Sequence, residues 1–117
     1  MKSMTTKEFL MQPFKLQKRI IRLHRKLEQE SKESAKPILL AKEEELILIY
    51  NQKTQDVKAA IYKLKDGRHK EVLERRYLLF QKWEQIALAM AYDYRYIFRL
   101  HGYALKEVED TVAKGAK

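Results

Sequence analysis

The chain has 117 residues, enough for one domain or for a small domain that carries an extension. It contains only three glycines, two prolines and no cysteine. This composition lacks the turn residues of a β-sandwich or barrel and the clustered glycines of a phosphate-binding loop. It also excludes disulfide scaffolds, cysteine zinc sites and thiol catalysis. The hydrophobic fraction of 45% argues against disorder throughout. The composition predicts a soluble, mostly helical chain, and with the helical patterns described below we expect the all-α class.

Basic residues exceed acidic ones, with 25 Lys and Arg against 16 Asp and Glu, for a formal net charge of +9. A positive charge of this size favours a polyanionic partner such as nucleic acid or an anionic membrane. The alternative is that the charge only keeps the protein soluble. The longest apolar stretch, residues 86–92, is too short to span a bilayer, and the charges at Lys2, Lys7 and Glu8 leave no room for a signal-peptide core. We therefore expect a cytoplasmic protein with no membrane partner.

Two helices are predicted before residue 30. Thr5 and Glu8 have the spacing of a capping box, which opens the first helix, and Pro13 predicts a break or kink near Gln12. After this proline, apolar residues recur at the a and d positions of a heptad: Leu16, Ile20, Leu23 and Leu27, with Ile21 beside them. A polar segment over residues 28–36 then ends the second helix.

A second amphipathic stripe follows between residues 43 and 64. The glutamates at 43–45 lie in its first turns, where the helix dipole favours anions, and Lys53 occupies one seam position. The stripe consists of Leu46, Tyr50, Val57, Ala60 and Leu64, with Ile47, Ile49 and Ile61 beside it. Because neither stripe can be buried alone, the two helices form an antiparallel hairpin or a coiled coil with a second chain. We expect residues 1–65 to be a helical leader that self-associates into a homo-oligomer, with a dimer favoured.

The leader also carries a basic run, which consists of Lys15, Lys18, Arg19, Arg22, Arg25 and Lys26. Such a run is usually the solvated flank of a coiled coil. An additional contact to a DNA backbone and a membrane-surface patch are the alternatives. The membrane is the less favoured of the two, because the adjacent apolar stripe needs a helical partner.

After the second stripe the chain changes character. Asp66 and Gly67 end that stripe and begin a helix that is expected over residues 68–80. A short helix follows over residues 83–90, with apolar residues at i, i+3, i+4 and i+7: Trp83, Ile86, Ala87 and Met90. Trp83 is expected to anchor the core, and a phosphate contact through its indole N–H is the alternative.

A break at residues 91–93 precedes the last predicted helix. Asp93 is a good N-cap for this helix. Its inner face consists of Ile97, Leu100, Ala104 and Val108. A helix, a tight turn and a second helix form a helix-turn-helix, so we expect residues 66–117 to be a DNA-binding domain.

The helix that begins at Tyr94 carries the most informative pattern. Between residues 94 and 106 it has no acidic residue, and it carries Arg95, Arg99, His101 and Lys106. The outward positions, opposite the inner face, are Tyr94, Arg95, Phe98 and Arg99. A recognition helix presents its N-terminal residues to base edges in the major groove, where arginine bonds guanine bidentately and tyrosine contacts thymine methyl groups or phosphates. This pattern favours double-stranded DNA as the partner.

Three segments resemble region 4 of bacterial sigma factors: Glu71-Val72-Leu73-Glu74-Arg75-Arg76-Tyr77, Trp83-Glu84-Gln85-Ile86-Ala87 and Arg99-Leu100-His101-Gly102-Tyr103-Ala104-Leu105, with Met90 and Tyr92 between the last two. The pattern is closer still to small phage and prophage proteins that pair a helical N-terminal half with a sigma-region-4-like helix-turn-helix. It resembles the late transcriptional regulators of the RinA and ArpU type. The strong part of the resemblance covers residues 66–108. It implies a sequence-specific DNA-binding transcriptional regulator, not an enzyme, in a bacterial host cell.

The resemblance also implies roles for individual residues. The base-facing positions are Tyr94, Arg95, Phe98 and Arg99, and Arg76 and Lys82 match positions near the phosphate backbone. Apart from the resemblance, we also expect Lys106 to contact phosphate. The chain departs from the family pattern at three positions: Phe80 stands where glycine is common, Lys82 where a serine cap is common, and Ala91 where the turn often has glycine. We expect the missing serine to cost the short helix about 1 kcal/mol and Ala91 to need a strained or adjusted turn geometry.

Other functions have less support in the sequence. The histidines His24, His69 and His101 are too far apart for metal-ligand spacing, and no nucleophile–base pair can be assembled, so we expect no enzyme, no metal site and no cofactor. His101 is expected to form a local hydrogen bond or to face DNA. A minor alternative is a stacking surface for single strands, made by Tyr92, Tyr94, Tyr96 and Tyr103. Two further classes stay open: a phage DNA-packaging adaptor of the small-terminase kind, and a protein that docks on host RNA polymerase without reading DNA.

Overall fold

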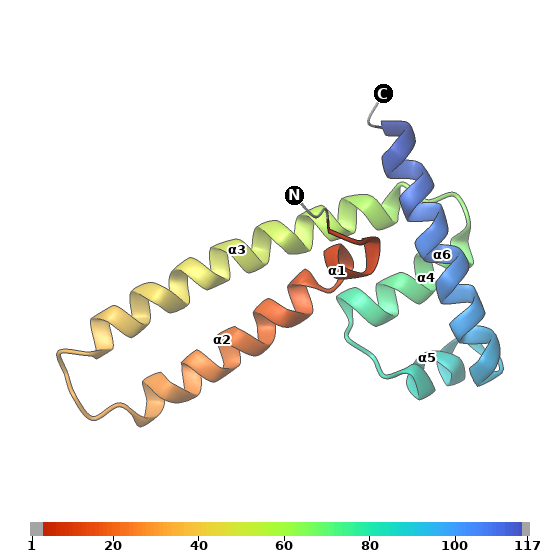
Figure 1. The fold of residues 1–117 in the computed structure, drawn as a ribbon. Coiled ribbons are helices and arrows are strands. Elements are labelled where there is room, and N and C mark those ends of the chain that lie inside the picture. Colours follow the sequence, from red (N-terminus) through yellow and green to blue (C-terminus); the bar gives the residue numbers. More distant parts are fainter. Residues whose placement is uncertain (1–3, 116–117) are drawn as a thin grey trace.

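The computed structural model describes residues 4–115, and every regular element in that range is a helix. In chain order the elements are α1 (Thr6–Leu10), α2 (Gln12–Gln29), α3 (Lys36–Tyr62), α4 (Gly67–Leu73), the π-helix η1 (Glu74–Leu78), α5 (Trp83–Met90) and α6 (Tyr94–Gly115). Helices α2 and α3 form a long arm, and the other helices gather at the end of the arm where α2 begins and α3 ends (Figure 1). The all-α prediction is confirmed for the described residues.

Local sequence signals set the ends of the first two helices. The Thr5 hydroxyl accepts the backbone N–H of Glu8 at 3.1 Å, which caps α1 as predicted. Only Met11 separates α1 from α2, and Pro13 lies in the first turn of α2, where its missing N–H needs no helical partner. The predicted break near Gln12 is therefore confirmed.

The start of α3 differs from the prediction. The helix begins at Lys36, so residues 43–45 lie in its interior and not in its first turns. Pro37 is in the first turn of the helix, where the fixed φ of proline is favourable. Leu39, two residues further on, is buried in the arm, and this burial favours a helix that begins before the glutamates.

The two apolar stripes face each other within one chain. Helices α2 and α3 lie side by side and run in opposite directions (Figure 1). Leu16 and Leu39 are buried between them, whereas most other stripe residues are half-buried: Ile20, Leu23, Leu27, Leu46 and Tyr50. Two helices alone cannot enclose a core, and α3 keeps further apolar side chains exposed: Ile38, Leu40, Ile47, Leu48 and Ile49.

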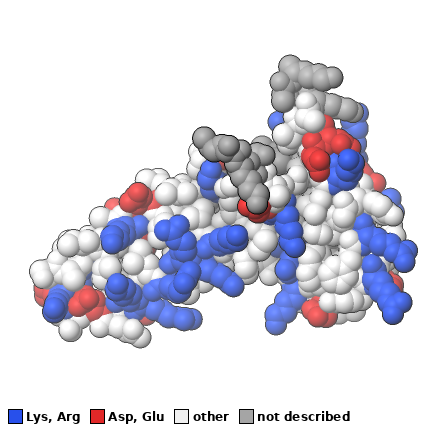
Figure 2. Space-filling model, viewed as in Figure 1, with Lys and Arg blue, Asp and Glu red and all other residues white. Residues whose placement is uncertain are grey.

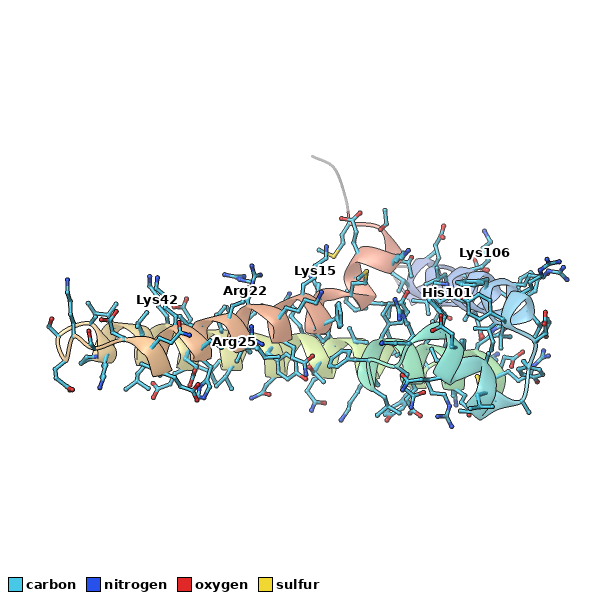
Figure 3. All side chains as sticks on the ribbon, turned by 90° about the horizontal axis from the view of Figure 1, so that it is seen from below. Lys15, Arg22, Arg25, Lys42, His101 and Lys106 are labelled. Atoms are coloured by element: carbon cyan, nitrogen blue, oxygen red, sulfur yellow. The ribbon has the colours of Figure 1, made fainter. Side chains whose placement is uncertain are left out.

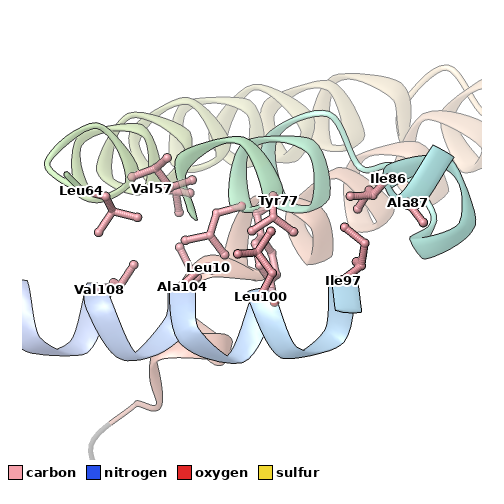
Figure 4. Packing of buried hydrophobic residues seen from close by; sticks show 13 residues of the cluster. Leu10, Val57, Leu64, Tyr77, Ile86, Ala87, Ile97, Leu100, Ala104 and Val108 are labelled. Atoms are coloured by element: carbon pink, nitrogen blue, oxygen red, sulfur yellow. The ribbon is translucent and has the colours of Figure 1, made fainter. Parts of the chain in front are cut away.

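The main core lies where the arm meets the C-terminal helices (Figure 4). It consists of Leu10, Val57, Ile61, Leu64, Val72, Leu73, Tyr77, Ile86, Ala87, Ile97, Leu100, Ala104 and Val108. All four predicted inner-face residues of α6 belong to it, so this prediction is confirmed. The core also takes residues from both sides of the expected boundary at residues 65 and 66. The arm is thereby fixed to the helices that follow it.

The helix expected over residues 68–80 is divided into two elements. Asp66 caps α4 by accepting the N–H of Arg68 at 2.9 Å, as the Asp66-Gly67 boundary predicts. After Leu73, however, the chain widens into η1, in which the N–H of Leu79 donates to the carbonyl of Glu74 at 3.0 Å. A single regular helix was therefore a wrong prediction. The wide turn carries Tyr77, which is buried against α6, and this tertiary contact outweighs local helical regularity.

A carboxylate of α6 ties the loop between α3 and α4 to the core. Oε2 of Glu107 accepts the backbone N–H of Lys65 at 2.8 Å, and Oε1 lies 2.7 Å from Nδ1 of His69. Partial burial opposes ionisation, but these hydrogen bonds outweigh it and lower the pKa of Glu107. The clamp fixes the C-terminal half of α6, whose N-terminal half is the candidate site.

Candidate nucleic-acid interface

The turn between α5 and α6 has a defined geometry. The N–H of Ala91 donates to the carbonyl of Leu88 at 3.2 Å, and the N–H of Tyr92 donates to the carbonyl of Ala87 at 3.0 Å. This pair of hydrogen bonds is a Schellman motif, which usually has glycine in its left-handed position. Ala91 occupies that position with a φ of 58°. The turn therefore keeps the geometry that glycine usually adopts, and of the two expected outcomes the structure has backbone strain at Ala91.

The first turns of α6 present a cationic and aromatic face. Asp93 accepts the backbone N–H of Arg95 at 3.2 Å, which is the predicted N-cap interaction. The side chains of Tyr94 and Phe98 are 42% and 43% exposed, and those of Arg95 and Arg99 are also exposed. Among residues 4–113, whose side chains are described, neither guanidinium has a hydrogen-bonding or ion-pair partner. The four predicted base-facing residues thus share one solvent-facing surface.

Aromatic contacts support this face from behind. The rings of Tyr94 and Phe98 meet edge to face with centroids 4.9 Å apart, and Phe98 lies 5.0 Å from the half-buried Trp83. The guanidinium of Arg76 lies 4.4 Å from the centre of the Trp83 ring. Trp83 packs against the core, as expected for an anchor, and it links α5 to the exposed face of α6.

The three predicted phosphate-contacting residues differ in solvent exposure and in their interactions within the chain. Arg76 is half-buried, and one of its N–H groups donates to the carbonyl of Gln81 at 3.0 Å. Lys82 is exposed at the N-terminus of α5. Lys106 is exposed on α6, with its Nζ 3.9 Å from a carboxylate oxygen of Asp110. Lys82 and Lys106 are thus accessible, whereas part of Arg76 is used within the fold.

The other departures from the family pattern also have structural consequences. Phe80 has a positive φ of 55°, a conformation that favours glycine, and its ring lies 5.5 Å from that of Phe14. The N–H of Lys82 donates to Oε1 of Gln85 at 2.8 Å, which is one half of a capping box. The other half is missing, because the lysine side chain has no acceptor for the N–H groups of the first turn of α5.

His101 lies behind the exposed face and not on it. Its side chain is 8% exposed, and its Nε2 lies 2.6 Å from the hydroxyl of Tyr77. Burial, together with the positive charges of Lys7 and Arg76, lowers the pKa of His101 to about 4. Burial likewise raises the pKa of Tyr77 to about 12. The pair is therefore neutral at neutral pH, and of the two roles expected for His101 the structure selects the local hydrogen bond.

The tyrosines of this region divide into two groups. Tyr92 and Tyr96 are half-buried and meet edge to face at 4.9 Å, and the Tyr96 hydroxyl accepts an N–H of Arg68 at 3.0 Å. Tyr103 is 59% exposed and follows Arg99 at the i+4 position. Sequence reasoning did not place Tyr103 beside the arginines, although its helical spacing from Arg99 was a sufficient signal.

Within residues 4–115, no helix is both long enough and apolar enough to cross a bilayer. The part of the chain that the structure describes also contains no group of three His, Asp or Glu side chains that could hold a metal ion. Comparisons of the chain with models of protein families, with curated proteins and with solved structures gave no match.

Proposed function

We propose that the protein is a sequence-specific, double-stranded-DNA-binding transcriptional regulator of phage or prophage origin, in which α5 and α6 form a helix-turn-helix. The observation that carries this proposal is the two-sided character of α6. Ile97 and Leu100 anchor the helix in the core, while Arg95 and Arg99 extend from its opposite side into solvent. A helix held in this way, with a cationic outer face at its N-terminal end, can enter a major groove.

The spacing of the exposed side chains suits the reading of adjacent bases. One helical turn separates Arg95 from Arg99, a rise of about 6 Å, which corresponds to roughly two base-pair steps of 3.4 Å. Each arginine can donate two parallel hydrogen bonds to O6 and N7 of a guanine. The rings of Tyr94 and Phe98 supply apolar contact to thymine methyl groups on the flank of the same surface.

The backbone supports the resemblance on which the regulatory function and the phage origin rest. The family pattern commonly has glycine at the positions of Phe80 and Ala91. In this chain these two are the non-glycine residues with positive φ among the described residues. Phe80 lies in the turn before α5, and Ala91 lies in the turn after it. Both turns therefore have the backbone conformation that glycine usually adopts, although neither contains glycine. This agreement is independent of side-chain similarity.

The exposed lysines have suitable positions for holding the DNA backbone. Lys82 lies at the N-terminus of α5, and Lys106 lies about three turns after the start of α6. Phosphate contacts at these two positions would fix the orientation of α6 in the groove without reading sequence. The remaining N–H groups of Arg76 can assist, although its position on the Trp83 ring makes it mainly a packing residue.

A dimer that reads two half-sites belongs to the same proposal. The facing stripes of α2 and α3 are already used within the chain, so self-association needs another surface. The exposed apolar residues of α3 offer one, and Leu48 is 70% exposed. Light scattering on the full chain tests this point. A mass of one or two chains supports a regulator, with two chains expected for the dimer, and a mass of eight or more chains supports the packaging adaptor.

The experiment that tests DNA reading begins with selection of bound duplexes from a random pool, followed by fluorescence anisotropy on the selected site. Arg95→Ala and Arg99→Ala should each weaken specific binding by about 1–3 kcal/mol, roughly tenfold to a hundredfold, and relax the base preference at one position. Lys63→Ala is the matched control, because it removes one exposed positive charge at the end of α3.

Charge-conserving variants separate base reading from simple attraction to phosphate. Arg95→Lys and Arg99→Lys keep the charge but lose the planar fork that bonds guanine, so they should lose sequence preference and keep their affinity for mixed-sequence DNA. The proposal fails if selection enriches no sequence. It also fails if both alanine variants bind the selected site like the wild type.

A further inference from the structure

A row of four basic residues on α2 forms a second cationic surface. Lys15, Arg19, Arg22 and Lys26 follow one another at spacings of four, three and four, which places them on one side of the helix. All four side chains are exposed. We call this surface the α2 basic row.

The α2 basic row is not neutralised within the chain. Among the side chains that the structure describes, none of the four has an ion-pair or hydrogen-bonding partner. The neighbouring Lys18 is different, because its Nζ lies 4.7 Å from the centre of the Phe14 ring. Like charges at i and i+4 repel each other and destabilise a helix. The free arm therefore carries a repulsion that a bound polyanion would relieve.

The row borders a shallow groove between α2 and α3. One section of this groove is lined by Arg19, Arg22, Lys26 and Leu46, and the next by Lys15, Arg19, Ile49 and Lys53. Helical spacing places Lys42 and Lys53, but also Glu45 and Asp56, toward this edge of α3. The edge of α3 is therefore close to neutral, and the excess positive charge belongs to α2.

The α2 basic row and the outer side of α6 share one face of the molecule. Figure 2 shows Lys and Arg side chains gathered along α2 and along α6 on the same side. In Figure 3, Lys15, Arg22, Lys42 and Lys106 all project in one direction. The longest dimension of the molecule is 51 Å, about the length of fifteen base pairs at 3.4 Å each. One straight duplex is long enough to meet both surfaces.

We infer that the α2 basic row binds the phosphate backbone of a DNA duplex, as a second contact outside the bases that α6 reads. The inference rests on the proposed function, because it takes duplex DNA as the polyanion. From Lys15 to Lys26 the helix rises about 16 Å, and over that length of duplex axis one strand carries about five phosphates. The row supplies charge without base-specific contacts, so it strengthens binding to every sequence equally.

The buried side of α2 favours DNA over a membrane surface. A helix that lies on a membrane inserts an apolar face between the lipids. In α2 the apolar residues are packed against α3, with Leu16 buried and Leu23 half-buried. The α2 basic row therefore offers charge alone, which suits a phosphate backbone.

The test measures the salt dependence of binding to a labelled 30-base-pair duplex of mixed sequence, by fluorescence anisotropy between 50 and 300 mM NaCl. The row variant combines Lys15→Gln, Arg19→Gln, Arg22→Gln and Lys26→Gln. Glutamine has a helix propensity close to that of lysine and arginine, so α2 should stay folded, which circular dichroism checks. If all four residues contact phosphates, the slope of log K against log salt falls in magnitude by about 3.6, and affinity at 100 mM falls by about 10³-fold.

Two control proteins separate local contact from overall charge. The first combines Lys32→Gln, Lys58→Gln, Lys63→Gln and Lys65→Gln, which lowers the net charge equally but lies outside the row. For this control, the slope of log K against log salt should differ from the wild-type slope by no more than about one. The second combines Arg19→Lys and Arg22→Lys, which should keep the wild-type slope because phosphate attraction needs charge and not the planar fork.

The outcomes distinguish this inference from the proposed function. If the row variant has the same slope as the control with four lysines replaced, the inference is overturned while DNA binding stands. If the row variant loses slope but the Arg95 and Arg99 variants keep full base preference, the inference stands and the role of α6 is refuted. If the wild type binds no duplex at 50 mM NaCl, both are overturned. Weaker binding to phosphatidylserine vesicles by the row variant than by the control with four lysines replaced would then assign the row to a membrane surface.

Discussion

The buried pair of His101 and Tyr77 should make the stability of the core depend on pH. Burial, with a smaller effect of the charges on Lys7 and Arg76, lowers the pKa of His101 from 6.5 to about 4. Between these two values the unfolded chain binds a proton that the folded chain excludes. The free energy of unfolding is therefore unaffected by His101 at pH 7.5 and decreases as the pH falls from about 6.5 to 4. The difference between the two pKa values corresponds to a loss of about 3 kcal/mol at pH 4.

Urea unfolding followed by circular dichroism between pH 7.5 and 4 tests this prediction, with His101→Gln as the comparison. The glutamine amide can still form a hydrogen bond with the Tyr77 hydroxyl but cannot bind a proton. Asp66 and Glu107, whose pKa values are also lowered in the folded chain, lose stabilising interactions in acid in both proteins. The difference between the two proteins thus isolates His101. Parallel curves for wild type and variant would refute the reasoning.

Two further substitutions test the turns around α5. Ala91→Gly should raise the free energy of unfolding by about 1 kcal/mol, because a left-handed φ of 58° strains a residue with a Cβ; thermal unfolding without a gain would contradict this. Lys82→Ser should stabilise α5 by about 1 kcal/mol through a side-chain cap. The same substitution should reduce the salt slope of DNA binding by about 1, because it removes one phosphate contact. Urea unfolding and anisotropy on one preparation measure both effects, and an unchanged slope would remove Lys82 from the interface.

The candidate site was accessible to sequence reasoning because it lies on one regular helix. A repeat of 3.6 residues separates the two sides of α6, so Ile97 and Leu100 could be assigned inward and Arg95 and Arg99 outward before any contact was known. In the structure, Ile97 and Leu100 are buried and Arg95 and Arg99 are exposed, as the helical repeat predicts. Arg76 shows the limit of this reasoning. Nothing in the local sequence indicates that its guanidinium lies on the Trp83 ring, seven positions away.

Long-range packing explains the predictions that failed or stayed open. The start of α3 depends on the burial of Leu39 against α2, and the widened turn of η1 accompanies the contact between Tyr77 and His101, which are 24 positions apart. The sequence also left open whether α2 and α3 pair with each other or with helices of a second chain. Contacts between residues that are distant in the sequence decide this point. Periodicity contains no information on such contacts.

By itself, the sequence determined the helical class, the capped starts of α1, α4 and α6, and the two faces of α6, because each of these depends on residues within a few positions of one another. Only the tertiary structure decided which stripes pair, that the chain widens into a π-helix where α4 ends, and that His101 is buried and neutral. These features depend on which surfaces exclude water together. The free energy of burying side chains from distant segments exceeds the small differences in local propensity that a sequence displays.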